Sequence, residues 1–114
     1  MGYSRAVRAG NFIAVSGTAA VGDDGEVVGA GDAYVQAQRC IDVIRAALEQ
    51  AGGRLEHVVR TRIFVTDIEL WTEIARAHQE AFAEIAPATS MVEVTRLIDP
   101  KMLVEIEADA IVDD

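Results

Sequence analysis

The sequence predicts one α+β domain over residues 1–114, built from a mixed sheet with two helices packed on one of its faces. Two segments carry apolar residues at three- and four-residue steps, as helices do, and the flanking segments alternate with a period of two, as strands do. The chain is 51% hydrophobic and only 5% aromatic, which is typical of a compact core of small aliphatic side chains. At 114 residues this core needs no disulfide or metal, and a second core would not fit.

The first two strands are expected to form a hairpin. Residues 3–9 and 11–16 are rich in strand-forming residues, and Gly10-Asn11 supplies the turn between them. Gly17 is expected to end the second strand.

A glycine-rich loop and a helix are expected next. Residues 18–31 contain four glycines, which predict a loop with room for a short strand at residues 26–28. Asp32 stands where a helix N-cap is expected, and Gly52-Gly53 stands where the helix should end. The buried stripe of this helix is expected to consist of Tyr34, Ala37, Ile41, Ile44, Ala47 and Leu48.

The second half of the chain repeats this succession of strand and helix. Residues 58–67 alternate with a period of two, and residues 70–85 return to helical spacing. Pro87 is expected to end this helix, because the residue before a proline is displaced from the helical conformation. Residues 90–97 and 102–112 alternate again, so the expected order of elements is ββ(β)αβαββ.

The alternation divides the side chains of the later strands between two faces of the sheet. One face of residues 58–67 is expected to hold Val59, Thr61, Ile63 and Val65. The second face is expected to mix charged and apolar side chains: Arg60, Arg62, Phe64, Met91, Glu93, Thr95, Leu103, Glu105 and Glu107. Two interpretations stay open: a face that meets other subunits and leaves clefts between them, or a solvated face covered by salt bridges.

Charge and cysteine content exclude several classes of partner. The formal net charge is −9, and so acidic a chain would repel a phosphate backbone, so no nucleic-acid partner is expected. Cys40 is the single cysteine, which rules out an internal disulfide and suits a reducing compartment such as the cytoplasm. The sequence has neither an export signal nor an apolar run of membrane-spanning length, so no membrane partner is expected either.

No metal and no cofactor are expected. His57 and His78 have no metal-ligating partner at a suitable spacing, and surface or capping roles are favoured over catalysis for both. Asp23-Asp24-Gly25 is typical of a hairpin turn, since a calcium loop needs a longer series of oxygen ligands.

Three blocks of the sequence, in the same order and at similar spacing, resemble the Rid (reactive intermediate deaminase, or YjgF) family. Residues 3–17, with Tyr-Ser-Arg-Ala-Val, Gly-Asn-Phe-Ile and Val-Ser-Gly, are similar to its N-terminal hairpin. Residues 61–67, Thr-Arg-Ile-Phe-Val-Thr-Asp, resemble its central strand. Residues 87–94 and 104–108 resemble its C-terminal motif, so the likeness runs along the whole chain.

This resemblance implies a chorismate-mutase-like (YjgF-like) fold assembled as a homotrimer, with small-molecule clefts between subunits. Members of the family hydrolyse imines and enamines to a keto acid and ammonia without a metal or cofactor. An arginine after the Pro-Ala pair holds the substrate carboxylate there, whereas this chain has Thr89. A second motif position, often cysteine, is Met91, and the motif tyrosine and glutamate are Tyr3 and Glu105.

The candidate site therefore has Glu105 as its catalytic residue, with Tyr3, Thr89, Ser90 and Met91 binding the substrate. Glu105 would orient the attacking water, and the hydroxyl groups would donate hydrogen bonds to the substrate.

Structural roles for the same residues stay open. Glu105 could instead pair with Arg60 or Arg62 across the sheet face. Tyr3 could pack against a sheet edge, and turn formation alone would explain the hydroxyl residues after Pro87-Ala88.

The leading functional hypothesis is a hydrolase of the deaminase type that acts on a small imine, enamine or carbonyl metabolite in an intersubunit cleft. The alternative is a non-catalytic module that binds a small metabolite in the same cleft. Thr89 divides the two, because no hydroxyl donor replaces a bidentate guanidinium–carboxylate pair. An endoribonuclease is least favoured, because the chain has a charge of −9 and no basic stripe.

Overall fold

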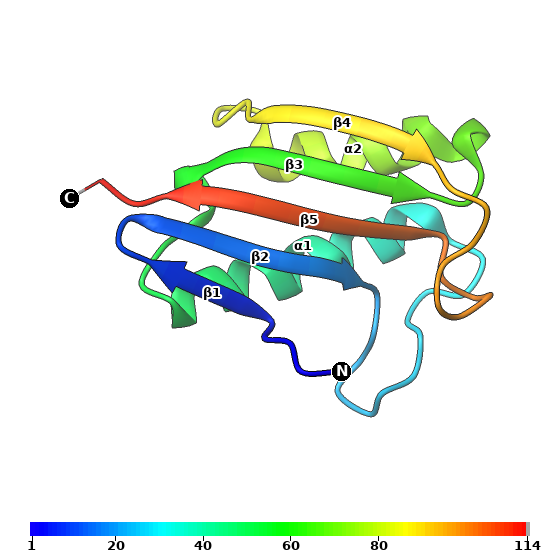
Figure 1. Ribbon diagram of the computed structural model, residues 1–114. Helices are drawn as coiled ribbons and strands as arrows, with labels where there is room; N and C mark the ends of the chain where they lie inside the picture. Colours follow the sequence, from blue (N-terminus) through cyan, green and yellow to red (C-terminus); the bar gives the residue numbers. More distant parts are fainter. Residues whose placement is uncertain (114) are drawn as a thin grey trace.

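The computed structural model describes residues 1–113 and contains one five-stranded sheet and two helices (Figure 1). The strands are β1 (Ala6–Ala9), β2 (Phe12–Ala19), β3 (Val58–Val65), β4 (Ala88–Glu93) and β5 (Val104–Ile111), and the helices are α1 (Ala33–Gln50) and α2 (Trp71–Phe82). Short 3-10 turns at Leu55–His57 and Ile68–Leu70 precede β3 and α2. The strand order is β1-β2-β5-β3-β4, with β3 and β4 parallel and every other pair antiparallel. The predicted mixed sheet and order of elements are confirmed.

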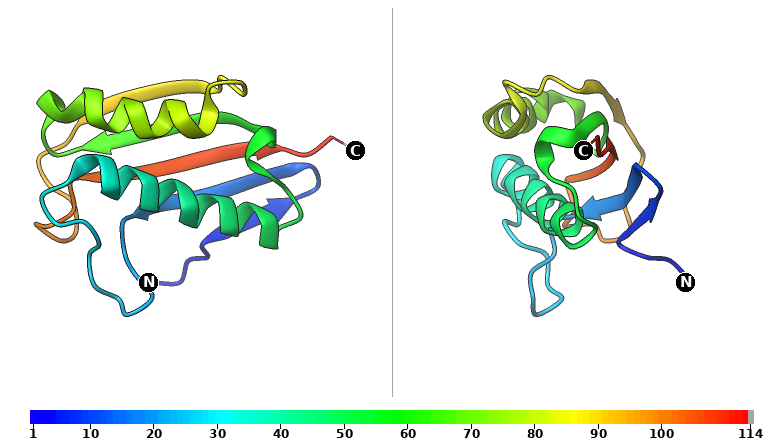
Figure 2. Two further views of the ribbon diagram at one scale, coloured as in Figure 1. Left: turned by 180° about the vertical axis from the view of Figure 1, so that it is seen from behind. Right: turned by 90° about the vertical axis from the view of Figure 1, so that its left-hand side faces the viewer.

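Both helices cover the same face of the sheet, as Figure 2 shows from behind and from the side. The core lies between these two layers. It takes alternate residues of the central strand β5, of which Val104, Ile106 and Ala108 are fully buried. The helices contribute Ile44 and Phe82, which are also almost completely buried. Removing these side chains from water is the main force that holds the helices on the sheet.

The first helix begins and ends where the sequence predicts. The Asp32 side chain accepts a hydrogen bond of 3.1 Å from the backbone N–H of Val35 and so caps α1. After the helix, Gly52 has a φ of 85°, a left-handed conformation that favours glycine, and the N–H of Gly53 donates to the carbonyl of Leu48.

Several boundaries differ from those expected. β2 continues past Gly17 to Ala19, because a register shift between Val15 and Thr18 absorbs the irregularity without ending the strand. The short strand expected at residues 26–28 is reduced to a single bridge between Val21 and Val27.

The second helix is shorter than residues 70–85. α2 ends at Phe82, and the chain turns through Ala86, which has a φ of 49° immediately before Pro87. The displacement of Ala86 from the helical region is confirmed. β4 then begins at Ala88, two residues earlier than expected.

Two expectations about the sheet faces are wrong. A register shift between Val58 and Arg60 gives the buried position to Val58 and leaves Val59 45% exposed. In β4, Met91 pairs with Ile63 and Glu93 pairs with Val65, so both lie on the helix side of the sheet and not on the second face. Alternation within β4 fixes which residues share a face, but only its pairing with β3 decides which face that is.

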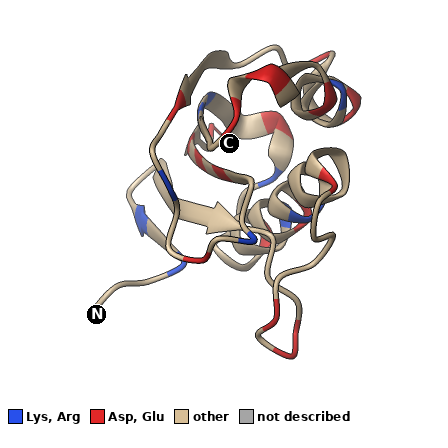
Figure 3. Cartoon of the chain, turned by 90° about the vertical axis from the view of Figure 1, so that its right-hand side faces the viewer, with Lys and Arg blue, Asp and Glu red and all other residues tan. Residues whose placement is uncertain are grey.

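The described part of the chain shows neither a basic face nor a membrane span. In Figure 3 the Lys and Arg positions are scattered among acidic ones. Neither α1 nor α2 is long and apolar enough to cross a bilayer.

Candidate functional site

An open cavity of about 590 Å³ lies where the segment before β1 meets β2 and β5. The polar residues of its lining are Tyr3, Arg5, Ser16 and Glu105. The structure therefore brings Tyr3 and Glu105 together, as the candidate site requires. Tyr3 is 63% exposed and precedes β1, so it does not pack against a sheet edge.

Glu105 is held beside the bulged end of β2. It pairs with Ala19 on one side and Phe64 on the other, and its side chain is half-buried. A Cβ at Gly17 would lie 2.6 Å from Glu105 Oε2, so the glycine leaves the space that the carboxylate occupies. This is a steric requirement for glycine, since side-chain atoms do not approach so closely.

Glu105 is not a partner of the sheet arginines. Arg62 Nη1 contacts Glu107 at 3.1 Å and Asp109 at 3.2 Å, and within residues 1–113 no ion pair includes Glu105. The alternative role of Glu105 as an ion-pair partner of Arg60 or Arg62 is therefore wrong, and Arg62 pairs with Glu107 and Asp109 instead. The guanidinium of Arg62 is already paired with these two carboxylates, which lie on the same face of β5 as Glu105.

Arg5 is the cation of this cavity, and the sequence analysis missed it. Its Nη2 donates to the Gly17 carbonyl at 2.6 Å, and its Nε is buried without a hydrogen-bond partner. The guanidinium carbon lies 5.7 Å from the centre of the Tyr3 ring. In the described residues no carboxylate pairs with Arg5, so its charge is available to a ligand. The signal in the sequence was its position two residues after Tyr3, because alternate residues of an extended segment share a side.

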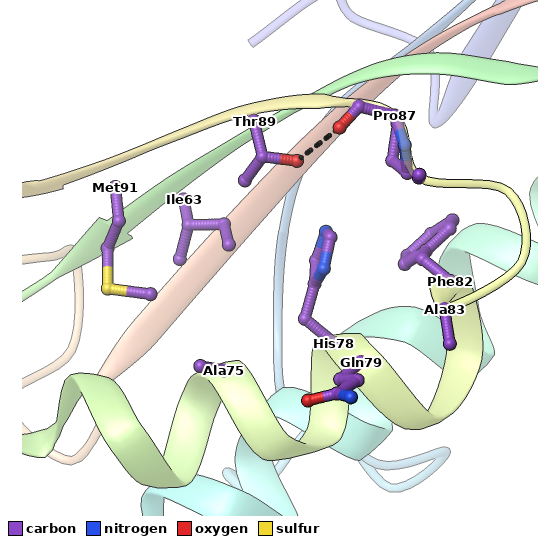
Figure 4. Close-up of a pocket in the computed structure, with 10 residues that line it drawn as sticks. Ile63, Ala75, His78, Gln79, Phe82, Ala83, Pro87, Thr89 and Met91 are labelled. Atoms are coloured by element: carbon purple, nitrogen blue, oxygen red, sulfur yellow. Dashed lines mark hydrogen bonds between the residues drawn. The ribbon is translucent and has the colours of Figure 1, made fainter.

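A second cavity, of about 390 Å³, lies between α2 and β4 (Figure 4). Thr89, Met91 and His78 line it, with Phe82 and Pro87 among its apolar walls. The Thr89 hydroxyl donates to the Pro87 carbonyl at 3.1 Å and lies 2.8 Å from the Thr61 hydroxyl. Thr89 and Ser90 both belong to β4, so the alternative that they only form a turn is wrong.

His78 does not have the surface or capping role expected for it. Its ring is half-buried, lines the second cavity and lies 2.9 Å from the Thr61 hydroxyl. Burial lowers the pKa of His78 below its usual value of 6.5, so the ring is neutral at pH 7. His57 does have a capping role, since its Nδ1 accepts a hydrogen bond of 3.0 Å from the backbone N–H of Arg54.

The candidate residues fall into two groups on opposite faces of the sheet. Thr89 pairs with Thr61 and Met91 with Ile63, on the side covered by the helices. Glu105 pairs with Phe64 on the other side, and Ser90 faces that side too, opposite Arg62. One chain therefore does not place Thr89 and Met91 around the same ligand as Glu105.

Residues 1–113 contain no group of three His, Cys, Asp or Glu side chains that could hold a metal ion. The chemistry available at the first cavity is that of a carboxylate, a phenol and a guanidinium: proton transfer, hydrogen bonding and anion binding.

The sequence matches the protein family described as Endoribonuclease L-PSP over residues 1–112. The chain belongs to this family. A crystal structure from Mycobacterium tuberculosis, described as a member of the YjgF/YER057c/UK114 family, is similar with a TM-score of 0.88 and 52% identity, covering 97% of this chain and 87% of that one. The family resemblance inferred from the sequence is thus confirmed.

Several relatives of this L-PSP family member carry the RutC name. A RutC family protein of Pyrococcus abyssi is 40% identical over 110 residues, which cover 95% of this chain and 84% of the relative. The 3-aminoacrylate deaminase RutC of Acinetobacter baylyi is 34% identical over 108 residues, which cover 95% of this chain and 85% of the relative.

The single cysteine of this family member is expected to be unreactive. Cys40 is fully buried in α1, and burial, with a smaller contribution from the charge of Glu105, raises the pKa of its thiol to about 12. Because only the thiolate reacts, modification by a disulfide reagent at pH 8 should be about a thousandfold slower than for a free cysteine. Absorbance of the released thiol measures this rate.

Unfolding in guanidinium should make Cys40 fully reactive within the mixing time of the assay. Rapid stoichiometric labelling of the native protein would contradict the burial of this thiol.

Proposed function

We propose that the protein is a hydrolase that deaminates a small imine or enamine, or acts on a related carbonyl metabolite, in a cleft between subunits of a homotrimer. No metal or cofactor takes part, and the proposed compartment is the cytoplasm. The observation that carries the proposal is the half-buried carboxylate of Glu105, which has no ion-pair partner among residues 1–113 and lies in a cavity that also holds Tyr3 and Arg5. The relative named 3-aminoacrylate deaminase supports the reaction type.

In the proposed reaction Glu105 orients a water molecule and accepts its proton as the water oxygen bonds to the C=N carbon. Glu105 passes this proton to the imine nitrogen, which gives a neutral carbinolamine. Glu105 then accepts the proton of the carbinolamine hydroxyl as the carbonyl forms and the C–N bond breaks. It delivers that second proton to the departing nitrogen, which leaves as ammonia, so the net reaction consumes one water and returns Glu105 to its carboxylate form.

Arg5 and Tyr3 would bind the substrate in this scheme. Arg5 lines the cavity and has further N–H donors besides the one given to the Gly17 carbonyl, so it can bind an anionic group of the substrate. It would then supply the positive charge that the family resemblance expects at position 89, where this chain has threonine. The Tyr3 hydroxyl would donate a hydrogen bond at the mouth of the cavity.

Assembly of several copies would bring the two cavities together. The second face of the sheet leaves four apolar side chains substantially exposed: Val7 (56%), Phe12 (43%), Val92 (47%) and Ile111 (47%). Apolar side chains that are left exposed on a sheet face support its use as an association surface. The Glu105 cavity of one subunit would then face the Thr89 and Met91 cavity of its neighbour, with Ser90 at the contact.

A non-catalytic binding module remains the second candidate, because the lining of the Thr89 cavity has no charged side chain to anchor a carboxylate. The ribonuclease activity in the family's description is not proposed, because the net charge of −9 and the scattered cations of Figure 3 offer no path for a phosphate backbone.

The protein is expected to be a trimer in solution. Three chains of 12.2 kDa would give a particle of about 37 kDa, in which the exposed apolar side chains of the second face are buried. Multi-angle light scattering at micromolar concentration measures the mass. A monodisperse 12.2 kDa particle would contradict both the assembly and the shared cleft.

Glu105→Gln should abolish catalysis and leave the assembly intact. Loss of a general base typically costs about a hundredfold or more in kcat. The substrate is a 2-imino acid generated in situ by an amino acid oxidase, and keto acid formation above the uncatalysed rate is the measurement. Glu107→Gln is the matched control, because Glu107 lies on the same face of β5 but pairs with Arg62 outside the cavity.

Wild-type acceleration that disappears in Glu105→Gln and persists in Glu107→Gln is the expected result. If the wild type accelerates no imine yet binds keto acids, the non-catalytic module is the correct function. Equal losses in both variants would show that Glu105 has no special role.

A further inference from the structure

A continuous hydrogen-bonded chain runs along the helix side of the sheet and ends in the second cavity. His78 Nε2 lies 2.9 Å from Thr61 Oγ1, and Thr61 Oγ1 lies 2.8 Å from Thr89 Oγ1. Thr89 Oγ1 in turn lies 3.1 Å from the carbonyl oxygen of Pro87. Figure 4 shows His78 and Thr89 on the walls of the cavity with the Thr89–Pro87 bond between strand and turn, and Thr61 is fully buried.

The hydrogen-bond acceptor at the end of this series, the Pro87 carbonyl, determines which atoms of Thr89, Thr61 and His78 donate protons. A carbonyl only accepts, so the bond to Pro87 uses the single proton of the Thr89 hydroxyl. Thr89 must then accept from Thr61, and Thr61, having donated its own proton, must accept from His78. All three hydrogen bonds form together only when His78 carries its proton on Nε2.

We propose that His78 is a positioning residue of the ligand cleft: through the buried Thr61 hydroxyl it sets whether Thr89 donates or accepts a hydrogen bond. With the proton on Nε2 the Thr89 proton points away from Thr61 and can be given to a ligand instead of Pro87. With the proton on Nδ1, Thr61 donates to His78, Thr89 donates to Thr61, and Thr89 can only accept. The Nε2–H form therefore selects a ligand with a carbonyl or imine acceptor, and this selection rests on the proposed function placing Thr89 in the cleft.

The surroundings of this chain point to a role beyond packing. Thr61 lies between core positions of β3, where a valine would fill the same space without needing a partner for a hydroxyl. The cavity lining is otherwise largely apolar and includes Ile63, Phe82 and Met91. In such a pocket a polar group such as the Thr89 hydroxyl fixes the orientation of a bound ligand.

No charged side chain lines the cavity to form hydrogen bonds with His78 or Thr89 in place of Thr61. The lining comes from β3, β4, α2 and the turn before β4, and it includes no Asp, Glu, Lys or Arg. The nearby charges of α2 point towards α1 instead: Arg76 stacks on the Tyr34 ring at 3.8 Å, and Glu80 accepts a hydrogen bond from the Tyr34 hydroxyl. On β4, Glu93 accepts from the backbone N–H of Ile68. His78 is thus a neutral ring whose tautomer is coupled to the direction of the hydrogen bonds at Thr61 and Thr89.

Nitrogen-15 NMR of the histidine side chains tests the proton positions without any ligand. The wild type should show His78 predominantly as the Nε2–H tautomer. Thr61→Val keeps the side-chain shape and removes the hydroxyl, so the His78 tautomer ratio should shift while that of His57 stays unchanged. A predominant Nδ1–H form in the wild type, or no change at His78 in Thr61→Val, would overturn the proposal.

Activity on the 2-imino acid tests the consequence. His78→Gln can still donate to Thr61 and should retain kcat/KM within about threefold, whereas His78→Phe keeps the ring volume, removes both nitrogens and should lose on the order of tenfold. His57→Gln is the matched control and should not change. A His78→Phe trimer as active as wild type would overturn the proposal. Absence of imine hydrolysis by the wild type would refute the proposed function instead, and the tautomer measurement would then decide this inference alone.

Discussion

The position of β5 at the centre of the sheet is the constraint on which the rest of the structure depends. It is hydrogen-bonded to β2 on one side and to β3 on the other, and its side chains alternate between the core and the second face. A shift of one residue would bury Glu105, Glu107 and Asp109 and expose Val104 and Ile106, which no other part of the chain could compensate. The hydrophobic core therefore fixes the position of the candidate catalytic carboxylate, because both belong to the same alternating strand.

The same sheet separates the two halves of the proposed site. The glycine at position 17 admits the Glu105 carboxylate on one face, beside Arg5. On the other face the turn through Ala86 and Pro87 starts β4 so that Thr89 meets Thr61. In the proposed function a neighbouring subunit completes the cleft, so activity is expected to depend on assembly. Such an assembly would account for the mixture of charged and apolar side chains on the second face, where ion pairs such as Arg62–Glu107 lie among apolar side chains that a neighbour would cover.

Local chemistry made much of this fold predictable from the sequence. The cap at Asp32 and the displacement of Ala86 before a proline depend on residues next to one another in the chain. The burial of alternate β5 residues follows from period-two spacing alone. The pairing of Tyr3 with Glu105 in one cavity was expected only from the family resemblance, and the structure places both there.

The remaining features depend on contacts between distant segments. The face occupied by Met91 follows from the parallel register of β4 against β3, which periodicity within β4 does not contain. His78 looked like a surface residue because Thr61 and Thr89, its neighbours in space, are far away in sequence. Arg5 was overlooked because its role appears only once β2 bulges and brings the Gly17 carbonyl to its guanidinium.

Subunit complementation tests most directly the claim that one site is built from two chains. Glu105→Gln damages one cavity, and Thr89→Asp, by adding a negative charge, damages the other, so each variant alone should be inactive on a 2-imino acid. When the two are unfolded together in equal amounts and refolded as mixed trimers, random pairing should restore about a quarter of the wild-type sites, because an intact cleft takes its Glu105 half and its Thr89 half from different variants. Activity near a quarter of wild type is the predicted result. Mixed trimers as inactive as the separate variants would contradict the shared cleft.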